Sequence, residues 1–311
     1  MYLGIDIGGT NLKAGLVDED GQLLRTLKEP LGPVSAPEEL AIRLAGMALA
    51  AAADDLDQVR SVGMGVPGAV EGGTIVYTCN IPMKNIPMER LFRAHLDLPV
   101  YLGNDADCAA LGEYHCGAGK GCRSLVAITL GTGIGGGMVF DGKIYEGLGM
   151  AGEVGHMVVE PDGVPCPCGR RGCWEQYASA SGLRRMTWEA MEAHPESLLW
   201  KITGGKRERL NGGTAFEAAR RGDETARAVC GAYIRYLAQG ITNLVNLLHP
   251  EVLAIGGGIS NEREESLLRP VREIVDRECY ASHGGRKTRV VKALLGNDAG
   301  VIGAAFLGRS R

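Results

Sequence analysis

The sequence lacks an excess of positive charge. Its 33 lysines and arginines are outnumbered by 37 aspartates and glutamates, and the formal net charge is −4. Proteins that bind the phosphate backbone of nucleic acids rely on clustered positive charge. The charge balance therefore makes nucleic acid a poor candidate partner.

Long apolar runs and an export signal are also missing. The longest apolar stretch, at 44–53, is rich in alanine and ends at two aspartates, so it predicts a packed helix and not a membrane span. The opening residues, MYLGIDIGGT, contain neither the basic start nor the apolar segment of a signal peptide. Nine cysteines without such a signal indicate a reducing compartment. We expect a cytoplasmic protein without a membrane partner.

One pattern of strands and turns occurs twice. The segments IDIGGTNLKAGLVDEDGQLL and AITLGTGIGGGMVFDGKIY both give a strand, a glycine-threonine turn, a strand, an Asp-Gly turn and a strand. Such a repeat predicts two similar α/β domains with a glycine turn from each facing a shared cleft, where ligands usually bind. We expect a smaller domain at 1–115 plus 298–311 and a larger one at 116–297. Further helices are predicted at 37–53, 106–114, 217–248, 262–277 and 298–307.

The first glycine turn follows an apolar strand. Gly9 allows backbone N–H groups to approach phosphate oxygens, and Thr10 and Asn11 add side-chain donors. Asp6, at the strand end, could hold Mg²⁺ through water. An ordinary hairpin is the alternative, and the repeat favours phosphate binding.

Two further glycine turns extend this interpretation. The turn around Thr132 and Gly133 contains a G-x-G-x-x-G spacing, but a strand follows it and not the helix that a dinucleotide site needs, so we reject NAD. The turn with Gly257 and Gly258 lies between a strand and a helix and allows adenine or ribose to lie against bare backbone. A plain strand-to-helix connection is its alternative.

The segment GNDAD follows an apolar strand and opens a helix. Asp105 either caps this helix or accepts the proton of a sugar hydroxyl as a phosphoryl group is transferred. Asn104 beside it could hold a neighbouring hydroxyl.

Three cysteines and a histidine have the spacing of a metal site. His156, Cys166, Cys168 and Cys173 make a tetrahedral donor set that suits a structural Zn²⁺, with three unrelated thiols as the alternative. Glu153 and Glu175 bracket this set, so a clamped loop could hold them for sugar hydroxyls. Glu175 could otherwise be a surface charge.

Together these segments resemble the ROK family of sugar kinases and repressors, within the actin-like ATPase superfamily. The zinc segment, of the form C-x-C-G-x-x-G-C-x-E, is the most specific and is similar to that of bacterial ROK glucokinases. The matching segments are DIGGTNLKAG at 6–15, GVPGAV at 65–70, Asn80, GNDAD at 103–107, LGTGIGGG at 130–137, AGEVGHM at 151–157, CPCGRRGCWEQYAS at 166–179, IGGGIS at 255–260 and GNDAGVIGAA at 296–305.

The resemblance implies a fold of the actin-like (ribonuclease H-like) class and transfer of the γ-phosphate of MgATP to the 6-hydroxyl of a hexose, glucose first. Asp105 would be the catalytic base. His156 would bind zinc through one nitrogen and face the sugar with the other. Sugar contacts would come from Gly68 (backbone), Asn80, Asn104, Glu153, His156 and Glu175; phosphates would lie near Thr10, Lys13, Thr132 and Gly133, and the nucleoside near Gly257 and Gly258. We expect a homodimer or homotetramer.

Other functions stay open at this point. The stretch 77–84 departs from the family's sugar loop, so N-acetylmannosamine, N-acetylglucosamine, allose or fructose could replace glucose, and polyphosphate could replace ATP. A sugar-responsive repressor would need a helix-turn-helix before Asp6, for which we expect no room. A non-catalytic actin-like module needs neither a zinc loop nor GNDAD. We also expect loss of zinc to weaken sugar binding and to spare ATP binding, because the phosphate turns lie elsewhere in the chain.

Overall fold

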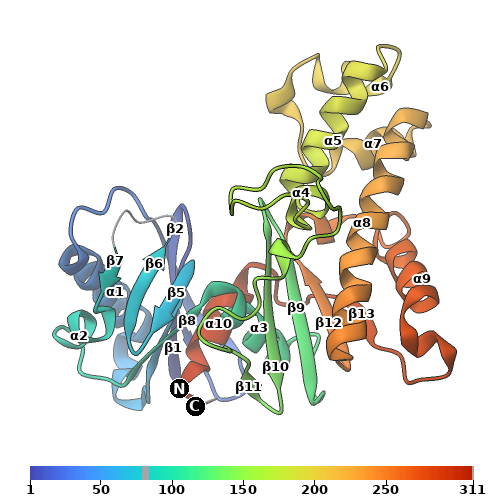
Figure 1. Cartoon of the computed structure of the whole chain (residues 1–311). Helices are drawn as coiled ribbons and strands as arrows, with labels where there is room; N and C mark the ends of the chain where they lie inside the picture. Colours follow the sequence, from blue (N-terminus) through green and yellow to red (C-terminus); the bar gives the residue numbers. More distant parts are fainter. Residues whose placement is uncertain (79–83, 310–311) are drawn as a thin grey trace. The chain divides into compact units, whose positions relative to one another are not determined.

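Two five-stranded sheets form the framework of the computed structural model, which describes residues 1–78 and 84–309 (Figure 1). The strand order is β3-β2-β1-β4-β8 in the first sheet and β11-β10-β9-β12-β13 in the second. Position by position, the strands of the second sheet repeat the first, with β9, β10 and β11 in the places of β1, β2 and β3. The predicted α/β class and the internal repeat are therefore confirmed.

Both sheets are mixed. In the first, β1 pairs antiparallel with β2 and parallel with β4, and β4 pairs parallel with β8. In the second, β10 and β11 are antiparallel and β12 and β13 parallel. The strands are β1 (Tyr2–Ile7), β2 (Asn11–Val17), β3 (Leu23–Pro30), β4 (Val62–Val66), β8 (Val100–Asn104), β9 (Ser124–Leu130), β10 (Ile134–Phe140), β11 (Lys143–Ile144), β12 (Val252–Gly256) and β13 (Arg289–Lys292), with a small sheet of β5 (Gly68–Glu71), β6 (Thr74–Thr78) and β7 (Lys84–Ile86).

The helices follow the predicted pattern with two corrections. They are α1 (Pro37–Ala52), α2 (Met88–Arg93), α3 (Asp105–Cys116), α4 (Glu175–Ala178), α5 (Ala180–Ala193), α6 (Leu198–Thr203), α7 (Thr214–Arg220), α8 (Glu224–Leu248), α9 (Leu268–Glu278) and α10 (Ala299–Ala305). The predicted helix 217–248 is two helices, because Gly222 has a φ of +94° and Asp223 caps α8 by accepting from the N–H of Ala226 at 2.6 Å. The predicted helix 262–277 begins only at Leu268, since Glu262 has an extended backbone after a single 3₁₀ turn.

The chain divides into two compact units. The first comprises Met1–Ala127, Gly136–Gly152 and Ala293–Arg311, and the second comprises Ile128–Gly135 and Glu153–Lys292. The predicted domain boundaries, 1–115 with 298–311 and 116–297, and the predicted cleft stay predictions.

Within the first unit, α10 packs directly on the first sheet and on α3 (Figure 1). A Cβ at Gly63 of β4 would lie 1.7 Å from the carbonyl oxygen of Ala304, so only glycine allows this approach of backbone to backbone. At the other end of α10, a Cβ at Gly300 would lie 3.0 Å from Oδ2 of Asp6. The close packing thus places the start of α10 against the carboxylate at the end of β1.

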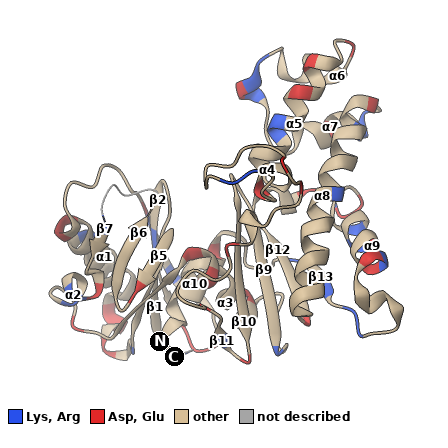
Figure 2. Ribbon diagram, viewed as in Figure 1, with Lys and Arg blue, Asp and Glu red and all other residues tan. Residues whose placement is uncertain are grey.

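Charged side chains lie mainly on helices and loops (Figure 2). Strands β9 and β12 contain no charged residue, as expected for strands whose residues are mostly buried. Among the described residues, no helix combines the length and the apolar character that crossing a bilayer requires.

Candidate functional site

The first glycine turn is a tight connection between β1 and β2. The N–H of Gly8 donates to the carbonyl oxygen of Asn11 at 2.9 Å, and Nδ2 of Asn11 donates to Oγ1 of Thr10 at 2.8 Å. Gly9 and Thr10 are exposed at its tip. The turn therefore offers the backbone and hydroxyl groups that were predicted to contact phosphate.

Asp6 and Lys13 lie opposite each other at the base of this turn. Burial raises the pKa of Asp6, and the positive charge of Lys13 acts in the opposite direction. Nζ of Lys13 donates to the carbonyl oxygen of Asn297 at 3.1 Å and forms an ion pair with Asp298. A desolvated carboxylate in this position fits a cation such as hydrated Mg²⁺. Sequence reasoning missed Asp298, although the matched segment at 296–305 contains it.

The second glycine turn lies against the zinc loop, which we define as residues 153–176. A Cβ at Gly133 would lie 2.5 Å from Oε2 of Glu175, and the N–H of Ala180 donates to the carbonyl oxygen of Gly131 at 2.9 Å. Both segments belong to the second unit. This turn lies elsewhere in the chain, as expected, yet it contacts Glu175 of the zinc loop, so distance along the chain does not separate ATP binding from zinc loss at this turn.

A cavity of about 340 Å³ joins the second and third turns. Its walls are Leu130, Thr132, Ala180, Ile259, Glu262 and the glycines at 131, 212, 213 and 258. Gly257 has a φ of +84°, and a Cβ there would lie 2.5 Å from the carbonyl oxygen of Leu130. Glycine at 257 thus lets the third turn pack on β9, and Gly258 and Thr132 both line the cavity, as a nucleotide site requires. The volume is within the usual range for a small-molecule site.

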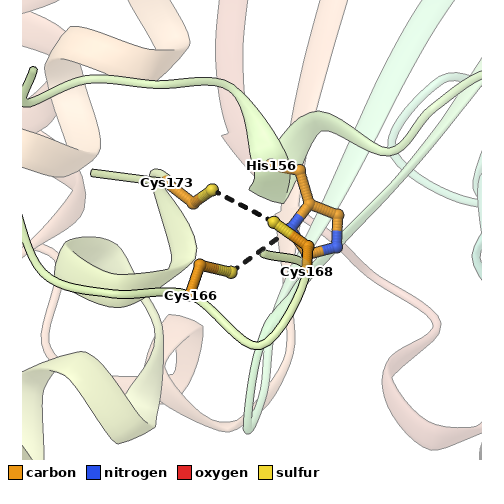
Figure 3. A group of neighbouring side chains, drawn as sticks. All are labelled: His156, Cys166, Cys168 and Cys173. Atoms are coloured by element: carbon orange, nitrogen blue, oxygen red, sulfur yellow. Dashed lines mark hydrogen bonds between the residues drawn. The ribbon is translucent and has the colours of Figure 1, made fainter. Parts of the chain in front are cut away.

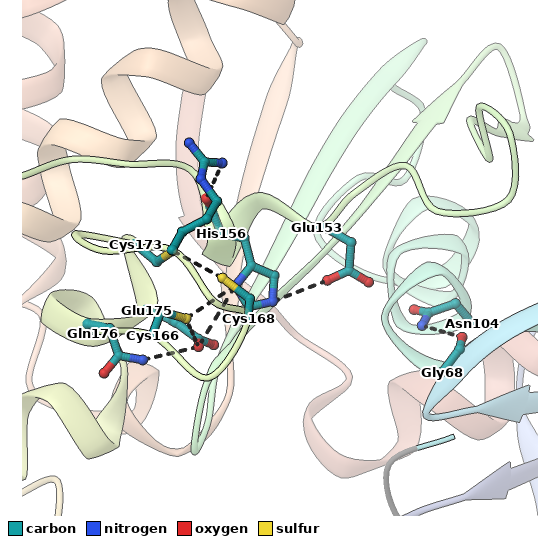
Figure 4. A network of polar contacts seen from close by, with 10 residues as sticks. Gly68, Asn104, Glu153, His156, Cys166, Cys168, Cys173, Glu175 and Gln176 are labelled. Carbon is teal, nitrogen blue, oxygen red and sulfur yellow. Dashed lines mark hydrogen bonds and ion pairs between the residues drawn. The ribbon is translucent and has the colours of Figure 1, made fainter. Parts of the chain in front are cut away.

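Asn104, and not Asp105, is the N-cap of α3. Its Oδ1 accepts from the N–H groups of Ala106 and Asp107 at 2.8 and 3.3 Å, and Oδ1 of Asp105 also accepts from the N–H of Ala106, at 2.9 Å, so Asp105 shares the bonding at the helix start that the alternative prediction gave it. Nδ2 of Asn104 donates to the carbonyl oxygen of Gly68 at 3.1 Å (Figure 4). Asp105 is the first residue of α3, where a carboxylate is favourable. Two predicted sugar-binding residues are thus joined beside the predicted base. Asn80 lies outside the described residues.

The four predicted metal ligands come together (Figure 3). The Sγ atoms of Cys168 and Cys173 are 3.6 Å apart, Sγ of Cys166 is 3.7 Å from Nδ1 of His156, and all four ligand atoms lie within 4.8 Å of one another. Thiolates at tetrahedral corners around zinc are about 3.8 Å apart. The cluster is therefore consistent with a structural Zn²⁺.

Metal binding at this cluster is linked to proton release. Burial raises the pKa of the Cys166 thiol to about 12 and also raises the pKa of Cys173. A hydrogen bond from the backbone of Arg170 lowers the pKa of Cys168. A bound cation would supply the charge that ionises the two buried thiols.

The zinc loop is fixed to α8 through Trp174. This side chain is fully buried, and its Nε1 donates to the carbonyl oxygen of Tyr236 at 2.8 Å. Its ring occupies the space above Gly240, where a Cβ would lie 2.0 Å from the indole. Glu175 follows Trp174 directly, so this anchor also determines where the Glu175 carboxylate lies.

Two carboxylates flank the cluster, Glu153 beside His156 and Glu175 beside Cys166 (Figure 4). Nδ1 of His156 faces Cys166, whereas Nε2 lies 3.9 Å from Oε2 of Glu153. Oε1 of Glu175 accepts from Nε2 of Gln176 at 3.2 Å and lies 3.4 Å from Sγ of Cys166. With Nδ1 committed to a metal, Nε2 would carry the proton and become an oriented donor.

Glu262 was missed by sequence reasoning. Its carboxylate lines the cavity and pairs with Arg220, with Nη1 and Oε2 2.7 Å apart. Nothing in the spacing of IGGGISNE identifies this residue, because Arg220 and the glycines at 212 and 213 come from a distant part of the chain.

Known proteins match the whole chain. The model of the ROK family matches residues 2–311. A glucokinase of Streptomyces coelicolor is 37% identical over 314 residues, covering 99% of this chain and 98% of the relative. A structure of a ROK family glucokinase from Streptomyces griseus in complex with glucose and AMPPNP is 38% identical, with a TM-score of 0.80 and coverage of 100% and 99%. The ROK hexokinase of Thermus thermophilus is 32% identical, with a TM-score of 0.81 and coverage of 98% and 97%.

These similarities confirm the predicted resemblance and the actin-like α/β class. The family match and the identity both extend over nearly the full length, so they include both glycine turns, the GNDAD segment and the zinc loop. The chain therefore belongs to the ROK family.

Proposed function

We propose that this chain, a sugar kinase of the ROK family, transfers the γ-phosphate of MgATP to the 6-hydroxyl of glucose. The observation that carries the proposal is the position of Glu175. Its carboxylate contacts Cys166 of the metal cluster through one oxygen and lies against Gly133 of the second phosphate turn with the other. A residue predicted to bind sugar is thus next to a turn predicted to bind phosphate. The glucokinases and the glucose complex among the relatives support the same activity.

Asp105 is the base in this proposal. A carboxylate of ordinary acidity cannot ionise an alcohol in advance, but it can accept the proton late in a loose transition state, as the phosphoryl group reaches the oxygen. The start of α3 keeps a carboxylate favourable at this position. Asn104 holds Gly68 and thereby orders the backbone that was predicted to contact the sugar.

The remaining roles divide between sugar and nucleotide. Glu153, His156 and Glu175 bind sugar hydroxyls, together with Asn80 and Asn104. Asp6 would hold hydrated Mg²⁺, which would neutralise charge on the phosphates. The donor phosphates lie along the first two turns, at Gly9, Thr10, Asn11, Lys13, Thr132 and Gly133, and the nucleoside lies at Gly257 and Gly258.

Zinc serves as a structural ion in this account. Three thiolates and Nδ1 of His156 would hold it, which would leave no ligand position for a substrate. The chain's own residues do the binding, and the metal cluster fixes where Glu153 and Glu175 lie. The thiolates also favour a reducing compartment such as the cytoplasm. A homodimer or homotetramer stays a prediction.

A panel of sugars tests the proposal. The purified protein is given MgATP and, separately, glucose, mannose, allose, fructose, N-acetylglucosamine or N-acetylmannosamine, and ADP release is followed by a coupled assay. Glucose should have the highest kcat/KM. A higher value for another hexose would replace glucose in the proposal, as the departure at 77–84 allows. ADP release that is equal with and without every sugar would refute a sugar kinase.

A further inference from the structure

The cavity between the second and third turns has one ionisable side chain, Glu262, among its described lining residues. Most of its surface is glycine backbone and aliphatic side chain, including Leu130 and Ile259. Gly212 leaves room for Ile259, since a Cβ there would lie 2.1 Å from Cδ1 of Ile259. Such a largely apolar cavity suits a nucleoside base, and the carboxylate in its wall needs a separate explanation.

Arg220 fixes the direction of the Glu262 carboxylate. Arg220 holds Oε2 at 2.7 Å, and Oε1 lies 3.2 Å from where a Cβ of Gly213 would be. The Glu262 side chain is 14% exposed, and Arg220 is 31% exposed. The pair therefore presents Oε1, an acceptor, along the glycine wall of the cavity. A carboxylate held in this way favours a hydrogen-bond donor and repels an anion.

Nucleoside triphosphates and inorganic polyphosphate, the two classes of phosphate donor, differ in the hydrogen-bond donors that they carry. A nucleoside carries hydrogen-bond donors, on the ribose hydroxyls and on the adenine amino group, whereas inorganic polyphosphate carries charge at every unit and few donors. We infer that Glu262 accepts a hydrogen bond from the nucleoside part of the phosphate donor and so selects a nucleoside triphosphate over polyphosphate. This inference deepens the proposed function and rests on it for the identity of the site.

Direct binding measurements test the inference without turnover. Isothermal titration calorimetry measures Kd for MgADP and for magnesium tripolyphosphate in the wild type and in Glu262→Gln. In the variant, the amide oxygen would turn to Arg220 and the amide N–H₂ would face the ligand's donor. Kd for MgADP should rise roughly tenfold or more, because a donor is left without its acceptor, while Kd for tripolyphosphate should stay unchanged or fall.

Glu264→Gln is the matched control. Glu264 also pairs with an arginine, Arg272, at 2.5 Å, but it does not line the cavity. Its Kd for MgADP should stay within twofold of the wild type, and both variants should melt cooperatively. Titration of 2′-deoxyADP and IDP then identifies the recognised group, because the analogue that lacks it binds the wild type and Glu262→Gln alike.

Two results would overturn the inference. One is a folded Glu262→Gln that binds MgADP within twofold of the wild type. The other is an equal loss of affinity for MgADP and tripolyphosphate, which would show a general disturbance of the cavity. Failure of the proposed function is seen separately, as a wild type that binds MgADP with this selectivity and phosphorylates no hexose.

Discussion

Gly133→Ala tests whether the second phosphate turn and the predicted sugar-binding carboxylate depend on each other. The added Cβ would lie 2.5 Å from Oε2 of Glu175, whereas ordinary contact begins at 3.4 Å. The carboxylate must therefore withdraw by about 0.9 Å, the difference between the two distances. Its other oxygen already accepts from Nε2 of Gln176 at 3.2 Å, so this movement strains or breaks that bond.

A displacement of about 1 Å in a binding group commonly costs up to about a hundredfold. A lost hydrogen bond in a closed site costs about 1–3 kcal/mol, or roughly tenfold to a hundredfold in affinity. We expect the glucose KM of Gly133→Ala to rise by that factor, while the zinc content stays at that of the wild type. Steady-state kinetics in glucose and calorimetric titration of glucose measure the effect.

Gly131→Ala is the control within the same turn, because its Cβ would have no neighbour closer than the carbonyl oxygen of Gly133, at 4.0 Å. Glu175→Gln and the double variant complete a cycle with Gly133→Ala. If Gly133→Ala acts through Glu175, the two effects on glucose affinity should be far from additive. A folded Gly133→Ala with a glucose KM within twofold of the wild type, or fully additive effects, would refute the reasoning.

Three further predictions concern the base, the metal and the cation site. Asp105→Asn should lower kcat roughly 10²- to 10⁴-fold with little change in glucose Kd, because the amide cannot accept the proton; a kcat within threefold of the wild type would remove Asp105 from the mechanism. Elemental analysis of chelator-washed wild type should find about one zinc per chain, and Cys168→Ser should lose it and raise the KM values of both glucose and ATP, since Glu175 lies against Gly133; an unchanged glucose affinity in folded, zinc-free protein would contradict this. Burial raises the pKa of Asp6 in the folded chain, so ionised Asp6 destabilises the ligand-free fold at pH values above the ordinary pKa of aspartate, and Asp6→Asn should stabilise the fold by an amount that grows over that range. Denaturant unfolding at about pH 3 and about pH 8 should show a larger gain in the free energy of unfolding at the higher pH, and an equal gain at both values would contradict this.

Much of the fold could be predicted because it is encoded locally. Apolar runs that enter glycine turns give the strands, and the repeat of this pattern gives the two sheets of identical strand order. The break between α7 and α8 was missed although the sequence marks it: residues 220–225 contain no apolar side chain, Gly222 has a φ of +94°, and Asp223 caps the new helix. The late start of α9 was missed although residues 262–266 are all polar and the apolar spacing begins only at Leu267.

The site residues also fall into two groups, those that lie close together in the sequence and those that only tertiary packing brings together. The zinc ligands lie within one short stretch, so their spacing alone predicts the cluster. By contrast, Lys13 and Asp298 are 285 residues apart, and Glu262 meets Gly213 only through tertiary packing. Glu113 gives a third case: its buried carboxylate accepts from the N–H groups of Leu294 and Leu295 at 3.0 and 2.7 Å. Contacts of this kind depend on the packing of α10 and cannot be inferred from neighbouring residues.

Transfer of label from ATP to glucose tests the central claim most directly. Purified wild type is incubated with glucose and MgATP labelled with ³²P at the γ-position, and the products are separated and identified. We predict that the label appears on glucose 6-phosphate at a rate that depends on glucose concentration and falls with Asp105→Asn. Label found only in inorganic phosphate, released equally with and without glucose or any other hexose, would contradict the account.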